Sequence, residues 1–339
     1  MRKALVFTFI ALFAFGVNAT ESLERIEDEI FDELPEEFEL LGPEVFHALI
    51  EYLGDQNLAT SDSPAVCTAR LTLTSGTAIT TSDVTAATTI YFTPYEGALC
   101  SLYSGAIWQL VSFSETSVAV PSTTTTPFDI FAYNNSGILT LETLDWTNDT
   151  TRATALTTQN GTLVKTGDAT RRYLGTGRTT GVSGQTEDST SKRFLWNMYN
   201  RVPRKLMAYY NVQNFDNTST SWKSLNGVTT TGLTRIEFVL GQSIEPVRLS
   251  ASIPQVGSAA GDYATGVGIN STSANSADLY GGASNASYPW VLSHYMNFPS
   301  VGFSYGQMLD VESSNPRAYL YYDSGGIQLK DALYGKVWS

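Results

Sequence analysis

The sequence predicts a mainly β protein, with two β-sandwich or jelly-roll-like domains after a short acidic helical segment at the N-terminus. Charged residues make up only 16% of the 339 residues, against about 25% in an average soluble protein. Thr, Ser, Asn and Gln must therefore supply much of the polar surface, and these residues favour strands and turns over helices. From residue 60 onward, short apolar runs alternate with turn signals, and hydrophobic residues at 42% are sufficient for real cores.

The first 19 residues have the pattern of a secretory signal peptide. Arg2 and Lys3 give a basic start, residues 4–17 are apolar, and residues 17–19 end in small side chains. The apolar run is short for a bilayer span. We expect a cleaved signal, and the alternative is an uncleaved apolar helix that serves as an anchor or assembly element.

Residues 20–58 form an acidic segment in which apolar residues recur at helical spacing. Residues 21–57 hold 13 acidic residues and one basic residue, Arg25, for a net charge of −12. Pro35 and the pair Gly42-Pro43 interrupt the pattern, so we expect two helices. The apolar stripes are Leu23, Ile26, Ile30 and Leu34 in the first helix, and Val45, Phe46, Leu49, Ile50 and Leu53 in the second.

This acidic segment has two interpretations. It is a helical assembly element, such as a trimeric or docking stem, or it is a solvated helix or flexible leader. Like charges at helical spacing, such as Glu24 with Asp28, weaken an isolated helix. We therefore expect the stripe to be ordered only against a partner: another copy of the segment or a basic surface on a neighbouring protein, rather than this chain's own β domains.

The first β domain is expected at residues 60–204. Alternation and turn residues predict strands at 70–74, 89–92, 106–111, 128–133 and 138–142. The clearest hairpin joins the last two of these through residues 134–137 (Asn-Asn-Ser-Gly). Residues 189–200, before Pro203, are predicted to be a helix or an irregular break between the domains.

The second β domain is expected at residues 205–339. Strands are predicted at 236–240, 247–251, 264–269, 308–311 and 318–322, with Gly-, Ser- and Asn-rich loops between them. Because the long loops and many aromatic residues lie here, we expect this domain to be distal and to face a ligand, and residues 60–204 to face the assembly.

Several runs in the first domain resemble a family of tailed-bacteriophage proteins known as tail-fibre or structural virion proteins. The runs are residues 66–76, 83–95, 146–152, 171–176 and 192–197. The resemblance covers residues 64–339 and is most specific at 66–204. It implies a virion location, a structural role and no catalytic residues.

Chemistry-bearing motifs are few. The run Gly302-Phe-Ser304-Tyr-Gly306 matches a hydrolase nucleophile elbow, but no His follows it, since the two His are His47 and His294. A glycosidase would need two carboxylates across a cleft, and Asp310 and Glu312 would share one face of a strand. The other acidic candidates are Glu237, Glu245, Asp262, Asp278 and Asp323. We expect no enzymatic activity, and we keep a glycan hydrolase as a third alternative.

Cys67 and Cys100 are the only cysteines. In an exported chain they could pair across strands as a disulfide, and in a virion assembled in the cytoplasm they would be buried thiols. Two His and two Cys make a zinc site improbable, so no metal or cofactor is expected.

Aromatic residues near the C-terminus suggest carbohydrate binding, because sugar rings stack on Tyr and Trp while amides bind their hydroxyls. The candidate residues are Tyr288, Trp290, Tyr319, Tyr321 and Tyr322. For each of them a role in the core or in a subunit contact is the competing interpretation.

The sequence thus favours a non-enzymatic virion appendage protein, fibre-like, on a phage tail or head, that binds a host surface glycan. The alternative is an exported cell-surface adhesin or extracellular filament subunit. The expected partners are further copies of the chain, with a trimer favoured, and other virion or filament proteins. The net charge of −13 argues against nucleic acid.

Overall fold

The computed structural model describes residues 66–339, apart from residues 211–214, 218, 255–261, 285–289, 313–316, 320–322, 325–326 and 329–330. The signal-like residues 1–19 and the acidic segment 20–58 lie outside the described residues. Residues 60–339 belong to one compact unit.

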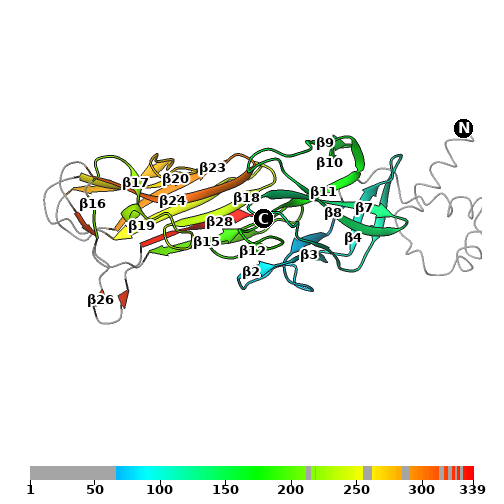
Figure 1. Ribbon diagram of the computed structural model, residues 1–339, viewed down its shortest axis with the longest axis horizontal. Coiled ribbons are helices and arrows are strands. Elements are labelled where there is room, and N and C mark those ends of the chain that lie inside the picture. The colour runs from blue at the N-terminus through cyan, green and yellow to red at the C-terminus, as the bar shows by residue number, and fades with distance from the viewer. Residues whose placement is uncertain are drawn as a thin grey trace, which may run out of the picture. The chain divides into compact units, whose positions relative to one another are not determined.

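The described part of the chain is mainly β, as predicted, and its strands form several sheets (Figure 1). Among these residues the one helical element is the 3-10 turn η2 (Leu225–Gly227). No helix in the described ranges is long and apolar enough to cross a membrane.

Three sheets make up most of the part before residue 204. A three-stranded sheet has the order β1 (Ala69–Thr72), β3 (Thr89–Pro94), β6 (Thr116–Ala119). A separate hairpin joins β4 (Leu99–Tyr103) to β5 (Trp108–Ser112). A six-stranded sheet has the order β8 (Ile138–Asp145), β7 (Pro127–Asn135), β11 (Asp168–Arg178), β10 (Thr162–Lys165), β9 (Leu156–Gln159), and β14 (Leu195–Asn197) pairs with β11.

The predicted hairpin at residues 128–142 is confirmed. Asn135 pairs with Ile138 at the end of β7 and β8, which leaves Ser136 and Gly137 as a two-residue turn. Both have positive φ, 54° and 89°, as hairpin turns that match the strand twist require. The Asn134 side chain accepts a 2.6 Å hydrogen bond from the Gly137 N–H and fixes the turn.

Two larger sheets make up the part after residue 204. The five-stranded sheet has the order β15 (Pro203–Tyr210), β28 (Asp331–Trp338), β19 (Val247–Pro254), β23 (Trp290–Asn297), β21 (Leu279–Tyr280). The eight-stranded sheet has the order β2 (Val84–Ala87), β12 (Thr186–Asp188), β13 (Lys192–Arg193), β18 (Arg235–Leu240), β24 (Gly302–Glu312), β20 (Asp262–Ile269), β22 (Gly282–Ser284), and β17 (Lys223–Ser224) pairs with β24. Two short pairs complete the fold: β16 (Phe215–Asn217) with β25 (Arg317–Tyr319), and β26 (Asp323–Ser324) with β27 (Ile327–Gln328).

The five- and eight-stranded sheets pack face to face as a sandwich. Alternate residues of their strands are buried between the sheets, and most of these are apolar, which is the alternation that a half-buried strand requires. One buried cluster contains Leu206, Leu249 and Leu333 from the first sheet and Phe238 and Met308 from the second.

The six-stranded sheet is the wall between two cores. Consecutive residues on β7, β11 and β14 belong to different clusters: Ile130, Leu174 and Leu195 to one, and Phe131, Tyr173 and Trp196 to the other. Because strand side chains alternate between faces, one sheet can serve both cores. The second core therefore takes side chains from both sides of residue 204, and the domain boundary at that residue stays a prediction.

The sequence predicted a helix or an irregular break at residues 189–200, whereas the structure has two short strands there. β13 pairs in parallel with β18, and β14 pairs with β11. All three residues of β14 are buried, with Trp196 only 1% exposed. Burial against two sheets outweighs the local pattern that suggested a helix.

Candidate functional site

The aromatic residues proposed from the sequence as glycan ligands are only partly described. Tyr288, Tyr321 and Tyr322 lie outside the described residues, and Trp290 and Tyr319 lie at the start of β23 and the end of β25. Their part in ligand binding stays a prediction.

The two cysteines are joined. A disulfide links Cys67 to Cys100, and the two residues also face each other as an isolated antiparallel bridge. Both are buried, at 6% and 0% exposure. The bond ties the segment before β1 to β4 and closes a loop across 33 residues of sequence.

The hydrolase-like run from Gly302 to Gly306 lies entirely within strand β24, so it does not form a strand-turn-helix elbow. Backbone conformation and close packing explain why glycine occupies both ends of this run. Gly302 has a φ of 100°, and a Cβ on Gly306 would come within 2.6 Å of the Leu249 side chain in the facing sheet. Ser304 is 1% exposed, and His294 makes a 2.7 Å hydrogen bond with the Ser250 hydroxyl.

The carboxylate pair Asp310 and Glu312 is buried between the sheets. Asp310 is 0% and Glu312 3% exposed, and alternation along β24 puts them on the same face as the core residue Met308. Asp331, on β28, is also buried. Burial and the nearby charge of Asp310 raise the pKa of Asp331 to about 8. No group of three metal-ligating side chains occurs among the residues that the structure describes.

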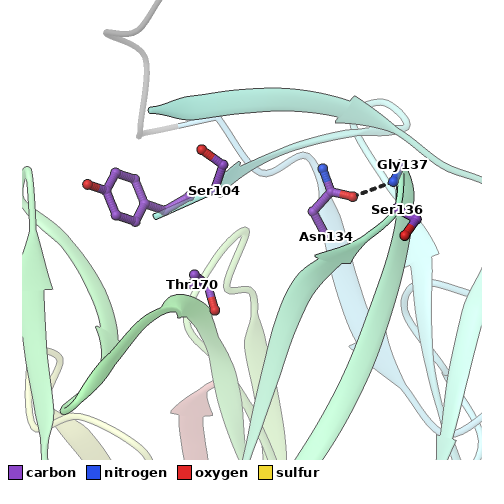
Figure 2. Close-up of a pocket in the computed structure, with 6 residues that line it drawn as sticks. Ser104, Asn134, Ser136, Gly137 and Thr170 are labelled. Carbon is purple, nitrogen blue, oxygen red and sulfur yellow. Dashed lines mark hydrogen bonds between the residues drawn. The ribbon is translucent and has the colours of Figure 1, made fainter. Parts of the chain in front are cut away.

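An open polar depression of about 270 Å³ lies where three segments meet, on the part of the chain before residue 204 (Figure 2). The end of β4, the turn between β7 and β8, and the start of β11 bring its walls together. The lining residues are Tyr103, Ser104, Asn134, Ser136, Gly137 and Thr170. Three hydroxyl side chains, one amide and one phenol line it, and no lining residue carries a charge.

Hydrogen bonds orient the amide of Asn134 in this depression. Its Oδ1 accepts a hydrogen bond from the Gly137 N–H, and its Nδ2 donates one to Gln109 Oε1 at 3.1 Å. An amide nitrogen has two hydrogens, and among the bonds of the described residues Asn134 uses one. The other is suited to a ligand oxygen.

The remaining walls are also held in place. The Thr170 hydroxyl lies 2.6 Å from Asp168 Oδ1 and accepts a 2.8 Å bond from Arg171. Tyr103 packs against Trp108, with ring centroids 5.5 Å apart. The Trp108 indole N–H in turn donates to Asn160, so the phenol ring has a supported position.

The charges nearest to the depression neutralise one another. Arg171 forms a 2.9 Å ion pair with Glu142 and lies 4.0 Å from the centre of the Tyr133 ring. Asp168 also lies 3.7 Å from Arg171, and Lys165 forms a 3.4 Å ion pair with Glu142, so two cations face two carboxylates. The depression therefore offers neutral hydrogen-bonding groups beside an aromatic ring, which suits a neutral, hydroxyl-rich ligand.

The sequence predicted the hairpin that supplies Asn134 and Gly137 but did not point to it as a binding site. The other residues that line the depression lie at positions 103–104 and 170. No local pattern signals that these segments converge, since long-range strand pairing brings them together.

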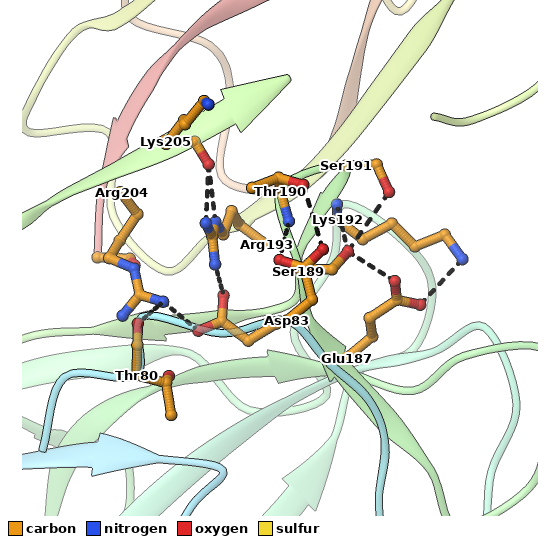
Figure 3. Close-up of polar contacts among 12 residues, drawn as sticks. Thr80, Asp83, Glu187, Ser189, Thr190, Ser191, Lys192, Arg193, Arg204 and Lys205 are labelled. Atoms are coloured by element: carbon orange, nitrogen blue, oxygen red, sulfur yellow. Dashed lines mark hydrogen bonds and ion pairs between the residues drawn. The ribbon is translucent and has the colours of Figure 1, made fainter. Parts of the chain in front are cut away.

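A separate buried network of ion pairs around Asp188 holds the two parts of the chain together. This carboxylate accepts from Arg193 at 2.8 Å and from Arg204 at 2.9 Å. Figure 3 shows the two arginines, Arg193 and Arg204, with Lys205 and Thr80, to whose carbonyls they respectively donate. Because Asp188 and both arginines are buried and joined by ion pairs, the network has the character of a structural element rather than of a reactive site.

Arg70 extends this arrangement. Its guanidinium donates to the carbonyls of Ala78, Asn200 and Ser339. Burial and the neighbouring charge of Arg204 lower the pKa of Arg70 to about 10. It stays protonated at neutral pH, and one buried cation thus joins three segments.

Comparison with known proteins does not assign the chain. No protein-family model matches it, and no curated protein matches it. Among solved structures, the insecticidal delta-endotoxin Cry8Ea1 from Bacillus thuringiensis is similar at 10% sequence identity and a TM-score of 0.18, over 79% of this chain and 51% of that chain. The chain spans about half the length of that toxin, and a likeness this weak carries no argument.

Proposed function

We propose that this chain is a non-enzymatic structural subunit of a virion appendage, of the tail- or head-fibre kind, which binds a neutral glycan of the host surface. The observation that carries the binding role is the uncharged depression lined by Tyr103, Asn134 and Thr170. The virion setting rests on the sequence resemblance at residues 66–204.

Carbohydrate fits the chemistry of the depression. A sugar ring presents C–H groups that stack on an aromatic face and hydroxyls that both donate and accept hydrogen bonds. Tyr103 supplies the ring. The hydroxyl hydrogens of Ser104 and Thr170 are donated within the chain. The second N–H of the Asn134 amide therefore serves as a donor to the ligand, and the Ser136 hydroxyl supplies both a donor and an acceptor. At about 270 Å³ the site is slightly smaller than typical ligand pockets, which begin at about 300 Å³, so it suits the tip of a glycan chain.

The described candidates for catalysis support a non-enzymatic role. Ser304 lies inside a strand, and Asp310 and Glu312 are buried in the sandwich rather than across a cleft from each other. A glycosidase needs its two carboxyl groups on either side of a bound sugar, and the lining of the depression has no carboxylate.

This proposal moves the binding role from the part after residue 204 to the part before it. The aromatic residues of 288–290 and 319–322 remain the competing location. The two locations can be separated by substitution, because no residue is common to both.

The test is binding of the purified full-length chain to an immobilised panel of neutral hexose and N-acetylhexosamine oligosaccharides. Asn134→Asp keeps the oxygen that holds the turn and replaces the amide N–H₂ by a carboxylate oxygen, while Tyr103→Ala removes the ring. We expect each to weaken binding roughly tenfold or more, which corresponds to about 1.4 kcal/mol.

The matched control is Tyr280→Ala, which removes a tyrosine that is 60% exposed and lies outside the depression. It should bind as the unsubstituted chain does, and melting curves should show that all variants are folded. If no oligosaccharide binds, or if both depression variants bind normally, the binding role is wrong. Release of reducing sugar from a bound oligosaccharide would overturn the non-enzymatic role.

A second setting is favoured by the disulfide between Cys67 and Cys100. Disulfides persist mainly in exported proteins, which favours a cell-surface adhesin or filament subunit that is exported through residues 1–19. N-terminal sequencing of the native protein separates the two settings. A start near Thr20 supports export, and a start at Met1 or Arg2 supports the virion.

A further inference from the structure

The outer face of the five-stranded sheet carries a row of three cations on adjacent strands. Lys205 on β15 pairs in register with Lys336 on β28, and Lys336 pairs in register with Arg248 on β19. We call these three residues the basic row. Lys205 and Arg248 are exposed and Lys336 is half-buried, with its ammonium group 5.7 Å from the centre of the Trp338 ring.

The basic row has no acidic partner within the described structure. None of its residues occurs among the ion pairs formed there. Like charges directly opposite each other on neighbouring strands destabilise a sheet. An isolated chain bears this repulsion, and an anionic partner would remove it.

Apolar side chains lie beside the basic row on the same face, with the polar residues Ser250, Ser252 and His294 among them. The next positions along the strands place Met207, Tyr334, Ser250, His294 and Leu279 in one row and Tyr209, Ala332, Ser252 and Leu292 in another. Met296 continues the basic row on β23.

These apolar side chains are unusually exposed for a sheet face. Leu279 is 70% exposed, Met296 55%, Leu292 46%, and Tyr209 and Tyr334 40% each. Exposed apolar side chains gathered on one sheet face mark an interaction site. A partner that fits must bring apolar groups and negative charge together.

The acidic segment of the chain has this combination. Residues 21–57 carry a net charge of −12, and their sequence spaces apolar residues at helical intervals. Each copy of the chain has one such segment and one such sheet face. If copies exchange these segments, every subunit of a closed oligomer has its acidic segment bound and its sheet face covered.

We propose that the outer face of the five-stranded sheet, with Lys205, Arg248 and Lys336 at its centre, binds the acidic segment 21–57 of a second copy of this chain. The carboxylates of the segment lie against the basic row, and its apolar stripe covers Met296, Leu292 and Tyr334. The inference concerns assembly and is independent of the glycan site, which lies on other strands.

The first test is sedimentation velocity of the full-length chain. The wild type should be oligomeric at about 50 mM salt and dissociate at about 500 mM, because salt screens exposed charges. The triple variant K205Q/R248Q/K336Q should associate roughly tenfold more weakly or be monomeric. The control T85E/S117E/T157E makes the same change of net charge at exposed positions on other strands, and it should assemble normally.

A charge swap identifies the partner. Chain X carries K205E/R248E/K336E. Chain Y carries E21K/E24K/E27K/D28K/E29K/D32K/E33K, which changes the net charge of residues 21–57 from −12 to +2. Each alone should fail to assemble because its segment and its sheet face have like charge. A mixture should assemble, since the segment of each chain then meets an opposite charge on the other.

Three outcomes overturn the proposal. The proposal is wrong if the wild type is monomeric at low salt, if the triple variant assembles as the wild type does, or if the mixture of X and Y stays dissociated. A dissociated mixture would also indicate that the acidic segment binds the sheet face of its own chain. Melting curves of X and Y establish that they are folded, and glycan binding by both should be unchanged.

Discussion

Asp188 and Arg204 form an ion pair in the protein interior, with 2.9 Å between Asp188 Oδ2 and a guanidinium nitrogen. Their side chains are 7% and 8% exposed. The other carboxylate oxygen accepts from Arg193, so one carboxylate is shared by two buried cations. The pair links β12 to β15, on opposite sides of the junction predicted from the sequence.

Asp188→Asn should destabilise the protein strongly. It keeps the shape of the side chain but leaves two buried arginines without a negative partner, which costs about 3–5 kcal/mol when a buried pair is broken. Urea unfolding measures the loss. The control is Glu245→Gln, which breaks the more exposed pair with Arg201 and should cost at most about 1 kcal/mol. Equal effects of the two substitutions would contradict a structural role for Asp188.

Asp331 should make the protein less stable at alkaline pH. Its pKa is raised from 3.8 to about 8 in the folded state by burial and by Asp310, so between these values the folded state binds more protons than the unfolded state. The contribution is fully present below about pH 4 and is lost as the pH rises through about 8.

Asp331→Asn removes this titration. The variant should match the wild type near pH 4 and exceed its free energy of unfolding near pH 9, by at most roughly 6 kcal/mol on the scale of 1.36 kcal/mol per pKa unit. Denaturant unfolding at both pH values measures the difference. Parallel pH profiles of the two proteins would show that Asp331 is already ionised at neutral pH in the folded chain.

Loss of the bond between Cys67 and Cys100 should lower stability by about 4 kcal/mol. The bond closes a loop across 33 residues, and loops of this order give that value in the chain-entropy treatment. Unfolding is compared with and without reductant for the wild type and for C67S/C100S. The double variant should be insensitive to reductant and should match the reduced wild type. Alkylation of both thiols in the untreated native protein would contradict the bond.

Gly137→Ala should weaken both the hairpin and the glycan site. Gly137 has a φ of 89° in the two-residue turn, and a Cβ in a left-handed conformation costs roughly 1–2 kcal/mol. Thermal unfolding and oligosaccharide binding should both decline. Gly181→Ala is the control, because Gly181 has no positive φ and its Cβ would have open space around it. Normal binding by a folded Gly137→Ala variant would show that the turn geometry does not matter to the ligand.

Local pattern was sufficient to predict the class of fold and its clearest hairpin. Alternation in 128–133 and 138–142, with a Ser-Gly turn between them, is information held within a short window of sequence. Residues 192–197 show the limit of this approach. Their strands pair with β18 and β11, which lie far away in the sequence, and burial of Trp196 decides a conformation that the local pattern left open.

The candidate site and the docking face depend on register, which the sequence does not reveal. The depression forms because Ser104, Asn134 and Thr170 lie at the ends of strands that converge. The basic row forms because Lys205, Lys336 and Arg248 are at opposed positions on strands more than 40 residues apart in sequence. Asp310 and Glu312 share a face of one strand, as expected, but only the packing of the two sheets shows that this face is the interior.

The central claim is that the depression beside Asn134 binds a neutral glycan. Amide chemical-shift mapping of the full-length chain, titrated with the tightest oligosaccharide from the panel, tests it most directly. The account predicts saturable shifts at Ser104, Ser136, Gly137 and Thr170, with the shifts abolished in Asn134→Asp. Shifts confined to residues 288–290 and 319–322, with none around the depression, would contradict it.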